Sequence, residues 1–361
     1  MTAANATLRA LTVGGSAYET GVGMGVFGRD IVHAHLIHTA GWAHVTAHRD
    51  DRRVGHMRDQ VQRLFPRHFA ELQGMAYGLE VPFADLFAWN CRGDIWAMAP
   101  EGCTTVMLPG PPITIAHNED GDPAFRGHCA WVRVEPDDGI AFSSFVYPAS
   151  LPGHAFALND AGLVQTVNNI RFLAAAQGVP RMVLARAMLD CADLDQAIDL
   201  LRHAERAGGY HLTLAQAGDP RLVSIEFSAH GCSVRSVTAP AVHANHAIHP
   251  GDRHIPQIVT DSSASRQARG DDLVKSGVAA RDPLAVLRDR AGPGLPIRRD
   301  DPADPDEENT LATVQFTVNH DGVTGRIHDT LAGPARFTFD VPRRSRPTVG
   351  PPGGGPEGCP R

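Results

Sequence analysis

The stretch GCTTVMLPGPPITIAHNED, residues 102–120, decides how the whole sequence is interpreted. A glycine stands directly before Cys103, at the point where a helical pattern gives way to short runs of β-forming residues. Because Gly102 has no Cβ, it lowers the steric cost of the bent backbone in which a thiol attacks the carbonyl of the preceding residue. The stretch therefore suggests a cysteine that cuts its own preceding peptide bond.

Self-cleavage would make Cys103 a new N-terminal residue that carries both a nucleophile and a base. Its α-amine would have a reference pKa of about 7.7 to 8, against about 10.4 for lysine, so it could act as a base near neutral pH. Such a site also needs a carboxylate beside the amine and a hydrogen-bond donor for the oxyanion. Asp120, at the end of the next predicted strand, and Asn245, after a later one, are the candidates. The alternatives are a small core cysteine, a turn at Asp120-Gly121, and a turn or cap at Asn245.

Composition limits the classes of protein to which the chain can belong. Its 361 residues suffice for one large or two ordinary domains with a substantial core. The net charge of -7 and the lack of a basic stripe argue against a nucleic-acid partner. Six cysteines without close pairs favour free thiols in a reducing compartment. No signal-peptide pattern or membrane-length apolar run is visible, so we expect a cytoplasmic protein without a membrane partner.

Hydrophobic periodicity predicts a layered α+β domain. Residues 14–90 are predicted to be mainly helical, with an amphipathic segment at 55–79 and a short helix at 81–89. A further helical block is predicted at 180–207, with Asp193 as a cap and Gly208-Gly209 as its end. Strands are predicted at 106–116, 129–134, 140–146, 155–169 (a hairpin), 210–216, 221–227, 232–237, 311–318, 323–328 and 336–341. Strand-rich blocks separated by helices favour layers over a doubly wound parallel sheet.

Two charged or biased segments are predicted to lie outside the packed domain. Residues 298–308 are charged and interrupted by proline, which is typical of a surface loop. Residues 342–361 are rich in Pro, Gly and Arg, which predicts a disordered tail.

In order and spacing, from about residue 14 to residue 341, the chain resembles the acyl-coenzyme A:isopenicillin N acyltransferase family, the C45 group of N-terminal nucleophile (Ntn) hydrolases. The matching motifs are GCTT (102–105), NED (118–120), Asn159 with Gly162 and Asn168, GVP (178–180), EFS (226–228) and HANH (243–246). The resemblance implies a four-layer αββα sandwich and autocatalytic cleavage at Gly102-Cys103. It also implies a heterodimer, in which a helical segment 1–102 stays bound to a catalytic part, 103–341.

The resemblance also assigns roles to residues. Cys103 would be the nucleophile, its α-amine the base, Asp120 the group that positions this amine, and Asn245 the oxyanion donor. Substrate-binding roles would fall to Thr105 (or a plain strand threonine), Asn118, Glu119 and Asn168. Two departures from the family pattern concern the pocket. Glu119 replaces an aromatic residue, and the acidic run 306–308 stands where the penicillin enzyme has an arginine, which argues against penicillin substrates.

The predicted function is hydrolysis of a linear amide of an acylated amine or amino acid through a Cys103 acyl-thioester. The alternative is an N-acyltransferase that uses an acyl-coenzyme A thioester as substrate, and a third possibility is an uncleaved, inactive binding relative. No cofactor is expected, because neither a P-loop nor a GxGxxG after a strand occurs. The histidine clusters HAHLIH (33–38) and VHANHAIH (242–249) lack ligands at i and i+4, so no metal is predicted and a zinc enzyme is the weakest alternative. The expected partners are the small-molecule substrate and the other fragment.

Overall fold

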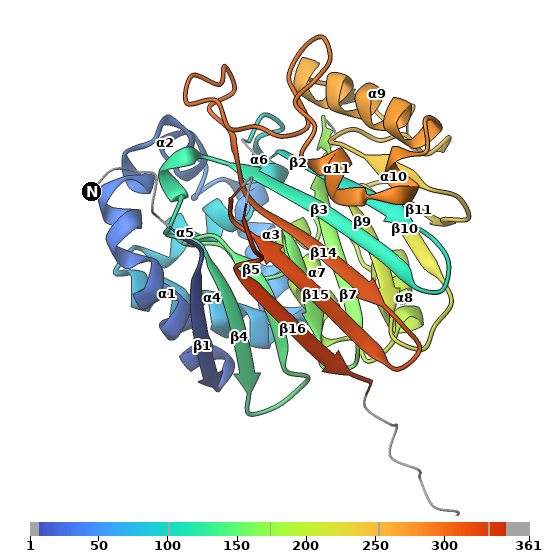
Figure 1. The fold of residues 1–361 in the computed structure, drawn as a ribbon. Coiled ribbons are helices and arrows are strands. Elements are labelled where there is room, and N and C mark those ends of the chain that lie inside the picture. Colours follow the sequence, from blue (N-terminus) through green and yellow to red (C-terminus); the bar gives the residue numbers. More distant parts are fainter. Residues whose placement is uncertain (1–6, 100–101, 174, 252, 331–332, 344–361) are drawn as a thin grey trace, which may run out of the picture.

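Two mainly antiparallel sheets face each other between layers of helices (Figure 1). The structure is a computed structural model that describes residues 7–99, 102–173, 175–251, 253–330 and 333–343. The fold is therefore α+β, as the sequence pattern predicts, with the layer order αββα that the family resemblance implies. Among the described residues, no helix is both long and apolar enough to cross a membrane.

The larger sheet has eight strands in the order β1-β4-β5-β6-β7-β9-β10-β11. Its strands are β1 (Arg9–Gly15), β4 (Ala130–Pro136), β5 (Phe142–Val146), β6 (Phe156–Asn159), β7 (Leu163–Asn169), β9 (Tyr210–Gln216), β10 (Leu222–Phe227) and β11 (Cys232–Ser236). All neighbours pair antiparallel except β1 and β4, which are parallel. The first strand of the chain thus closes one edge of a sheet made otherwise from residues beyond Cys103.

The smaller sheet has six strands in the order β12-β2-β3-β14-β15-β16. Its strands are β2 (Gly102–Leu108), β3 (Ile113–Gly121), β12 (Ala241–His243), β14 (Asn309–Val318), β15 (Gly322–His328) and β16 (Phe337–Pro342). The short strands β8 (Arg171–Phe172) and β13 (Gln257–Ile258) form a separate pair. Cys103 is therefore the second residue of an interior strand.

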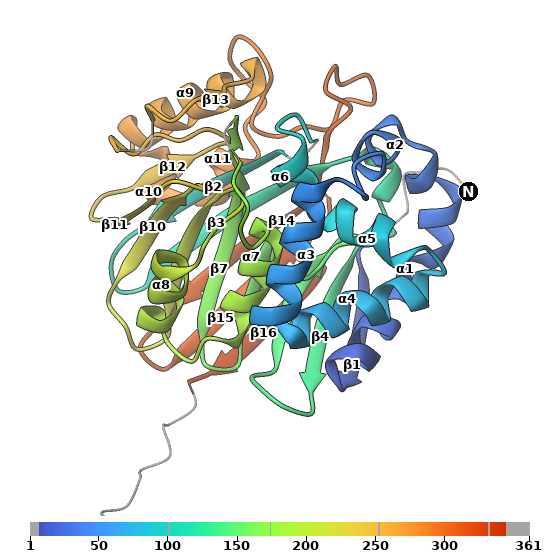
Figure 2. The ribbon, with the colours of Figure 1, turned by 180° about the vertical axis from the view of Figure 1, so that it is seen from behind.

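Helices cover the outer sides of the two sheets. Figure 2 shows α1, α3, α4, α5, α7 and α8 in front of the larger sheet, whereas α9, α10 and α11 lie against β12, β2 and β3. The α-helices are α1 (Ala17–Ala34), α2 (Ala40–Thr46), α3 (Arg52–Leu64), α4 (Pro66–Leu79), α5 (Phe83–Asn90), α6 (Arg92–Ile95), α7 (Arg181–Ala187), α8 (Leu194–His203), α9 (Asp261–Lys275), α10 (Val278–Arg281) and α11 (Pro283–Leu287). The described residues also include the 3-10 turns η2 (Leu36–His38), between α1 and α2, η3 (Pro123–Phe125), between β3 and β4, and η4 (Met188–Asp190), between α7 and α8.

Aromatic side chains fill the space between the sheets. Phe156 of β6 meets Phe316 of β14 with ring centroids 6.4 Å apart, and Trp131 of β4 stacks on Phe339 of β16 at 5.3 Å. Both contacts join one sheet to the other. Burying such large apolar surfaces is the main favourable term that holds the sandwich together.

Several predicted elements differ from the structure. Strand β1 lies partly within the region predicted to be helical, because only Val13 of its seven residues is fully buried and the apolar alternation is weak. The helix predicted to end at Gly208-Gly209 ends instead at His203. Gly209 has another role, since a Cβ there would clash with the backbone carbonyl of Phe227. In the hairpin, the strands and the turn at 159–162 are confirmed.

Two predicted loops also need correction. Residues 298–308 are not simply a surface loop, since Arg298, Arg299, Asp304 and Glu308 are all buried. They remain inside because they pair with one another, for example Arg299 with the carboxylate of Asp304. Pro342, predicted to begin the tail, closes β16, whereas residues 344–361 of that prediction lie outside the described residues.

Candidate active site

The pairing of β2 with β3 sorts the predicted residues onto the two faces of the smaller sheet. Cys103 lies opposite Glu119, and Thr105 lies opposite His117. Side chains alternate along a strand, so these four residues share one face, whereas Asp120, opposite Gly102, projects from the other. The first face meets the larger sheet and the second meets α9 and α11.

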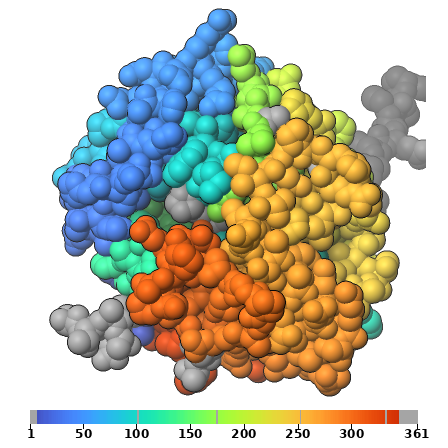
Figure 3. Space-filling view, turned by 90° about the horizontal axis from the view of Figure 1, so that it is seen from above, coloured from blue at the N-terminus to red at the C-terminus, as the bar shows by residue number. Residues whose placement is uncertain are grey.

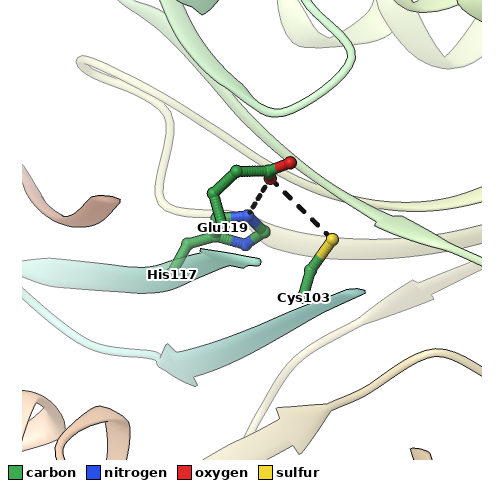
Figure 4. Close-up of side chains that lie close together, drawn as sticks. All are labelled: Cys103, His117 and Glu119. Atoms are coloured by element: carbon green, nitrogen blue, oxygen red, sulfur yellow. Dashed lines mark hydrogen bonds and ion pairs between the residues drawn. The ribbon is translucent and has the colours of Figure 1, made fainter. Parts of the chain in front are cut away.

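On the inner face, the thiol begins a chain of buried hydrogen bonds (Figure 4). Cys103 Sγ donates to Glu119 Oε2 at 3.8 Å, and the same oxygen lies 3.2 Å from His117 Nε2. His117 Nδ1 is 2.8 Å from Thr105 Oγ1, whose hydroxyl donates to Asn168 Oδ1 of β7 at 2.7 Å. All five residues are buried, and Cys103 is only 3% exposed. The ligand-type atoms of Cys103, His117 and Glu119 also lie within 4.8 Å of one another, a spacing that a metal ion could bridge.

These contacts fix where the protons are. Asn168 Nδ2 donates to the His243 carbonyl, so Asn168 Oδ1 must face Thr105 as an acceptor. The single hydroxyl proton of Thr105 is used on Asn168, and His117 Nδ1 therefore donates to Thr105 Oγ1. Burial lowers the pKa of His117 to about 3, so the ring is neutral and its Nε2 carries no proton. In this tautomer, a hydrogen bond between Nε2 and Oε2 requires a protonated Glu119, so that the pair would hold one shared proton.

The hydrogen-bond chain continues into the later histidine cluster. Asn168 Oδ1 accepts from His211 Nδ1 at 3.0 Å, and His211 Nε2 contacts Ser224 Oγ at 2.8 Å. His211 stacks on His243 with ring centroids 3.5 Å apart, and His249 Nε2 lies 3.0 Å from Ser224 Oγ. These rings are thus packed into a polar network between the sheets.

The histidines of the earlier cluster, 33–38, have hydrogen-bond partners outside the network around the thiol. His33 Nε2 is 2.8 Å from the Leu79 carbonyl, and His38 Nε2 is 3.0 Å from the His33 carbonyl. His35 Nε2 pairs with Asp122 Oδ2 at 2.5 Å. Each of the three rings thus has a different hydrogen-bond partner, and these partners explain the positions of the rings without a metal ion bound between them.

On the outer face, Asn245 and Arg266 hold the backbone of Cys103. Asn245 Oδ1 accepts from the Cys103 N–H at 2.9 Å, while its Nδ2 donates to the Asn169 carbonyl at 3.1 Å. The fully buried guanidinium of Arg266, from α9, donates to the Cys103 carbonyl, to Thr104 Oγ1 and to Asn245 Oδ1. Burial lowers the pKa of Arg266, and the nearby Asp120 charge opposes that shift. The N–H, carbonyl and thiol of Cys103 are therefore each engaged by a different side chain.

Two carboxyl groups flank the Gly102-Cys103 step on this outer face. Asp120 Oδ1 accepts from Thr310 Oγ1 at 2.6 Å, but its buried Oδ2 has no hydrogen-bond partner among the described residues. Burial raises the pKa of Asp120. A Cβ on Gly102 would clash with Glu308 Oε2, so a larger residue there would have to displace the end of the Glu308 side chain. Burial raises the pKa of Glu308 to about 7, although Arg299 opposes the shift.

Two cavities lie beside the step. The larger, about 320 Å³, is lined mainly by aromatic side chains and carboxylates, among them Trp89, Trp96, Phe125, Tyr147, Asp120, Asp122, Asp306 and Glu307, and Arg92 also lines it. The smaller, about 180 Å³, is lined by Arg171, Arg266 and Glu308 among others. Met98 and Asp306 line both. Figure 3 looks onto this side of the molecule, which is hollowed where the blue N-terminal helices approach the orange residues near 306.

The structure brings together most of the predicted site residues but not all of them. Thr105, Glu119 and Asn168 join the thiol on the inner face, whereas Asn118 contacts the Leu287 carbonyl and Thr313 on the outer face. Sequence reasoning missed four residues: His117, which contacts Glu119; Arg266, which contacts Cys103 itself; and Glu308 with its partner Arg299, beside Gly102. The alternating positions 117 and 119 could have indicated His117. No pattern marked Arg266.

The two facing sheets, the enclosing helices and a Gly-Cys step at the start of an interior strand define an α+β fold of the N-terminal nucleophile hydrolase type. A family model described as acyl-coenzyme A:6-aminopenicillanic acid acyl-transferase matches residues 109–331, more than half of the chain. The chain belongs to this family, which confirms the resemblance seen in the motifs. The matched residues begin after Cys103.

A curated relative is the beta-alanyl-dopamine/carcinine hydrolase of Drosophila melanogaster. The two sequences are 28% identical over 166 residues, which cover 40% of this chain and 43% of the relative. The chain thus aligns with less than half of that protein. Together, the family and this relative support hydrolase or acyltransferase chemistry.

Proposed function

We propose that the chain is a self-cleaving cysteine amidohydrolase that acts on a linear amide through a Cys103 acyl-thioester. The observation that carries the proposal is the surroundings of Cys103, which opens an interior strand with its N–H on Asn245 and its thiol on Glu119. Asp120 lies across the strand pair at Gly102 with one buried oxygen that has no partner among the described residues. A new α-ammonium at Cys103 would give that oxygen a partner.

In the proposed cycle, the α-amine of Cys103 takes the thiol proton and the thiolate attacks the substrate carbonyl. The amine leaves with a proton, and water hydrolyses the thioester to release the acid. Asp120 would position the α-amine. Asn245 is proposed as the oxyanion donor because its amide lies at Cys103. In the uncut chain its oxygen faces the Cys103 N–H, so this role needs the amide to turn after cleavage.

The larger cavity favours substrates with an aromatic part and a positive charge. Aromatic rings attract cations through their π faces, and Asp122, Asp306 and Glu307 add negative charge to the walls. The relative's name describes hydrolysis of beta-alanyl-dopamine and carcinine, which supports amide hydrolysis as the first choice. An acidic wall is unsuited to the carboxylate of a penicillin.

We further propose that residues 1–102 stay bound to residues 103–341 after cleavage. Strand β1 pairs with β4 over seven residues, and the buried Glu71 of α4 forms an ion pair with Arg186 of α7 at 2.9 Å. Both contacts join the two proposed fragments. Breaking them would leave an open sheet edge and an uncompensated buried charge.

Mass measurement under denaturing conditions tests the proposal. A chain cut at Gly102-Cys103 should give fragments of about 11 and about 28 kDa, in proportion to their shares of the 38.7 kDa chain. Cys103→Ala should remain intact and inactive. An intact wild-type chain would support the third possibility, an uncleaved binding protein, whereas two fragments from Cys103→Ala would point to an external protease.

The alternative is an acyl-coenzyme A-dependent N-acyltransferase, which the family description favours. Both activities share the acyl-thioester and differ in whether water or an amine resolves it. Incubating the processed protein with an acylated aromatic amine, with and without a second amine, separates them. Release of free acid in both reactions supports the hydrolase, whereas formation of a new amide supports the transferase.

A further inference from the structure

Self-cleavage needs a base other than the α-amine of Cys103, because that amine exists only after the cut. Before the cut, the nitrogen of Cys103 is a peptide N–H bonded to Asn245, so it cannot accept the thiol proton. The first reaction must therefore use another group within reach of Sγ. Glu119 Oε2 is such a group, because the thiol already donates to it.

We propose that Glu119, paired with His117, takes the Cys103 thiol proton during self-cleavage. The inference rests on the proposed function and adds the base of its first step. Glu119 touches the reacting atom and is the catalytic residue. His117 Nε2, 3.2 Å away, accepts the proton that Glu119 passes on, so the two residues act as one relay.

Every proton and bond in the proposed cleavage can be accounted for. The thiol proton passes to Glu119 Oε2 as the proton already there passes to His117 Nε2. Cys103 Sγ bonds to the Gly102 carbonyl carbon, and the bond from that carbon to the Cys103 nitrogen breaks. One proton from the pair goes to this nitrogen, which becomes an amine. Water then attacks the thioester, Sγ regains a proton, and Gly102 ends as a carboxylic acid.

The other carboxyl groups near the step are less suited to this task. Asp120 and Glu308 lie on the outer face of the smaller sheet, around Gly102, whereas the thiol lies on the inner face. Asp120 is already bonded to Thr310, and Glu308 to Arg299. Glu119 is bonded to the thiol, and Thr105 holds its partner His117 through Nδ1. The two faces thus separate the base of the cut from the carboxylate proposed for the mature amine.

Timed processing of freshly made full-length chain tests this assignment. Wild-type, Glu119→Gln and Glu119→Asp chains are made by cell-free synthesis, and fragments are followed by denaturing mass measurement. Glu119→Gln keeps the shape but removes the carboxyl group that relays the proton to His117, and should slow cleavage at pH 7 by about 10²- to 10⁴-fold. Glu119→Asp keeps a carboxylate at a longer distance and should recover part of the rate. The matched control is Glu135→Gln, an exposed glutamate of β4, which should cleave at the wild-type rate.

The pH profile separates a chemical role from a structural one. The wild-type rate should change little between pH 6 and 8, because the pair supplies the base. In Glu119→Gln, the thiol must lose its proton to solvent. The cleavage rate of this variant should therefore rise about tenfold per pH unit, and the difference between the wild-type and variant rates should become smaller as the pH rises. A gap that stays constant with pH would mean that Glu119 only shapes the site, and would overturn the proposal. His117→Gln removes the final proton acceptor, so it should slow cleavage to a similar extent, and its rate should approach the wild-type rate in the same way as the pH rises.

Three further results would distinguish the possible failures. Wild-type chain that is never cut would sink the proposed function itself. Wild-type chain that is cut, together with Glu119→Gln cut equally fast, would sink only the assignment of the base. Cleavage that requires added Zn²⁺ and stops with a chelator would replace the base by a metal held on Cys103, His117 and Glu119. We expect the chelator to have no effect.

Discussion

Replacing Glu308 by glutamine should change how the stability of the chain depends on pH. Glu308 is 4% exposed, and burial raises its pKa from 4.5 to about 7. Burial outweighs the attraction of Arg299, and the nearby Asp120 charge adds to the upward shift of the pKa. Between pH 4.5 and 7 the folded chain keeps a proton that the unfolded chain has lost. The contribution of Glu308 to the free energy of unfolding is therefore largest below pH 4.5. It falls as the pH rises from 4.5 to 7 and does not change further above pH 7.

The expected size follows from the shift. A difference of about 2.5 pH units corresponds to about 3 kcal/mol. Urea unfolding at pH 4.5 and pH 8 should be measured for Cys103→Ala and for Cys103→Ala with Glu308→Gln, since both chains remain in one piece. Relative to the chain with Glu308, the glutamine variant should gain about 3 kcal/mol of unfolding free energy when the pH is raised from 4.5 to 8. A shift below about 1 kcal/mol would refute the view that Glu308 is buried largely in its neutral form.

Three other outcomes are expected. Asp120→Asn should still be cut, but its kcat/KM on an acylated amine should fall by about 10²-fold or more, because the α-amine loses its charged partner; unchanged kcat/KM would contradict the role given to Asp120. In the Cys103→Ala background, Arg266→Met should lower the free energy of unfolding by about 3 to 5 kcal/mol, measured in urea, because it removes a buried cation with three acceptors. Arg269→Met, on the same helix but paired with Asp289 at the surface, should cost less than about 1 kcal/mol, and equal losses would count against the network. Among matched amides, kcat/KM should be higher for a cationic aromatic substrate than for an anionic one, and the reverse order would exclude the acidic wall as the binding surface.

The layers of the fold could be predicted from the sequence because strand and helix periodicities are clear on either side of Cys103. Helix α9 could not, because its buried positions include Ser262, Ser263, Arg266 and Gln267. A helix that buries polar side chains shows no apolar stripe, so the periodicity that reveals other helices is lacking. The same property hid Arg266, which a pattern-based analysis treats as one more surface charge.

Glu119 shows how far the sequence could lead within the site. Its place between Asn118 and Asp120 suggested a residue at the rim of a pocket. Its contact with the thiol depends on the register that sets Cys103 opposite Glu119, and this register follows from how the loop at 109–112 closes. A shift of one residue would have pointed Glu119 to the outer face. Local composition does not reveal such a register, so the geometry was needed to find the thiol's partner.

The place of β1 bears on the order in which the protein must be made. This strand belongs to residues 1–102, yet it covers the edge of β4 in a sheet built otherwise from residues beyond Cys103. Synthesised alone, residues 103–361 would present a seven-residue strip of unpaired N–H and carbonyl groups, which is a template for aggregation. When both parts are translated as one chain, each copy of β4 is made together with one copy of β1. Strand β1 is also synthesised before the edge of β4 that it covers. Cutting after folding would then free the new terminus without ever exposing that edge.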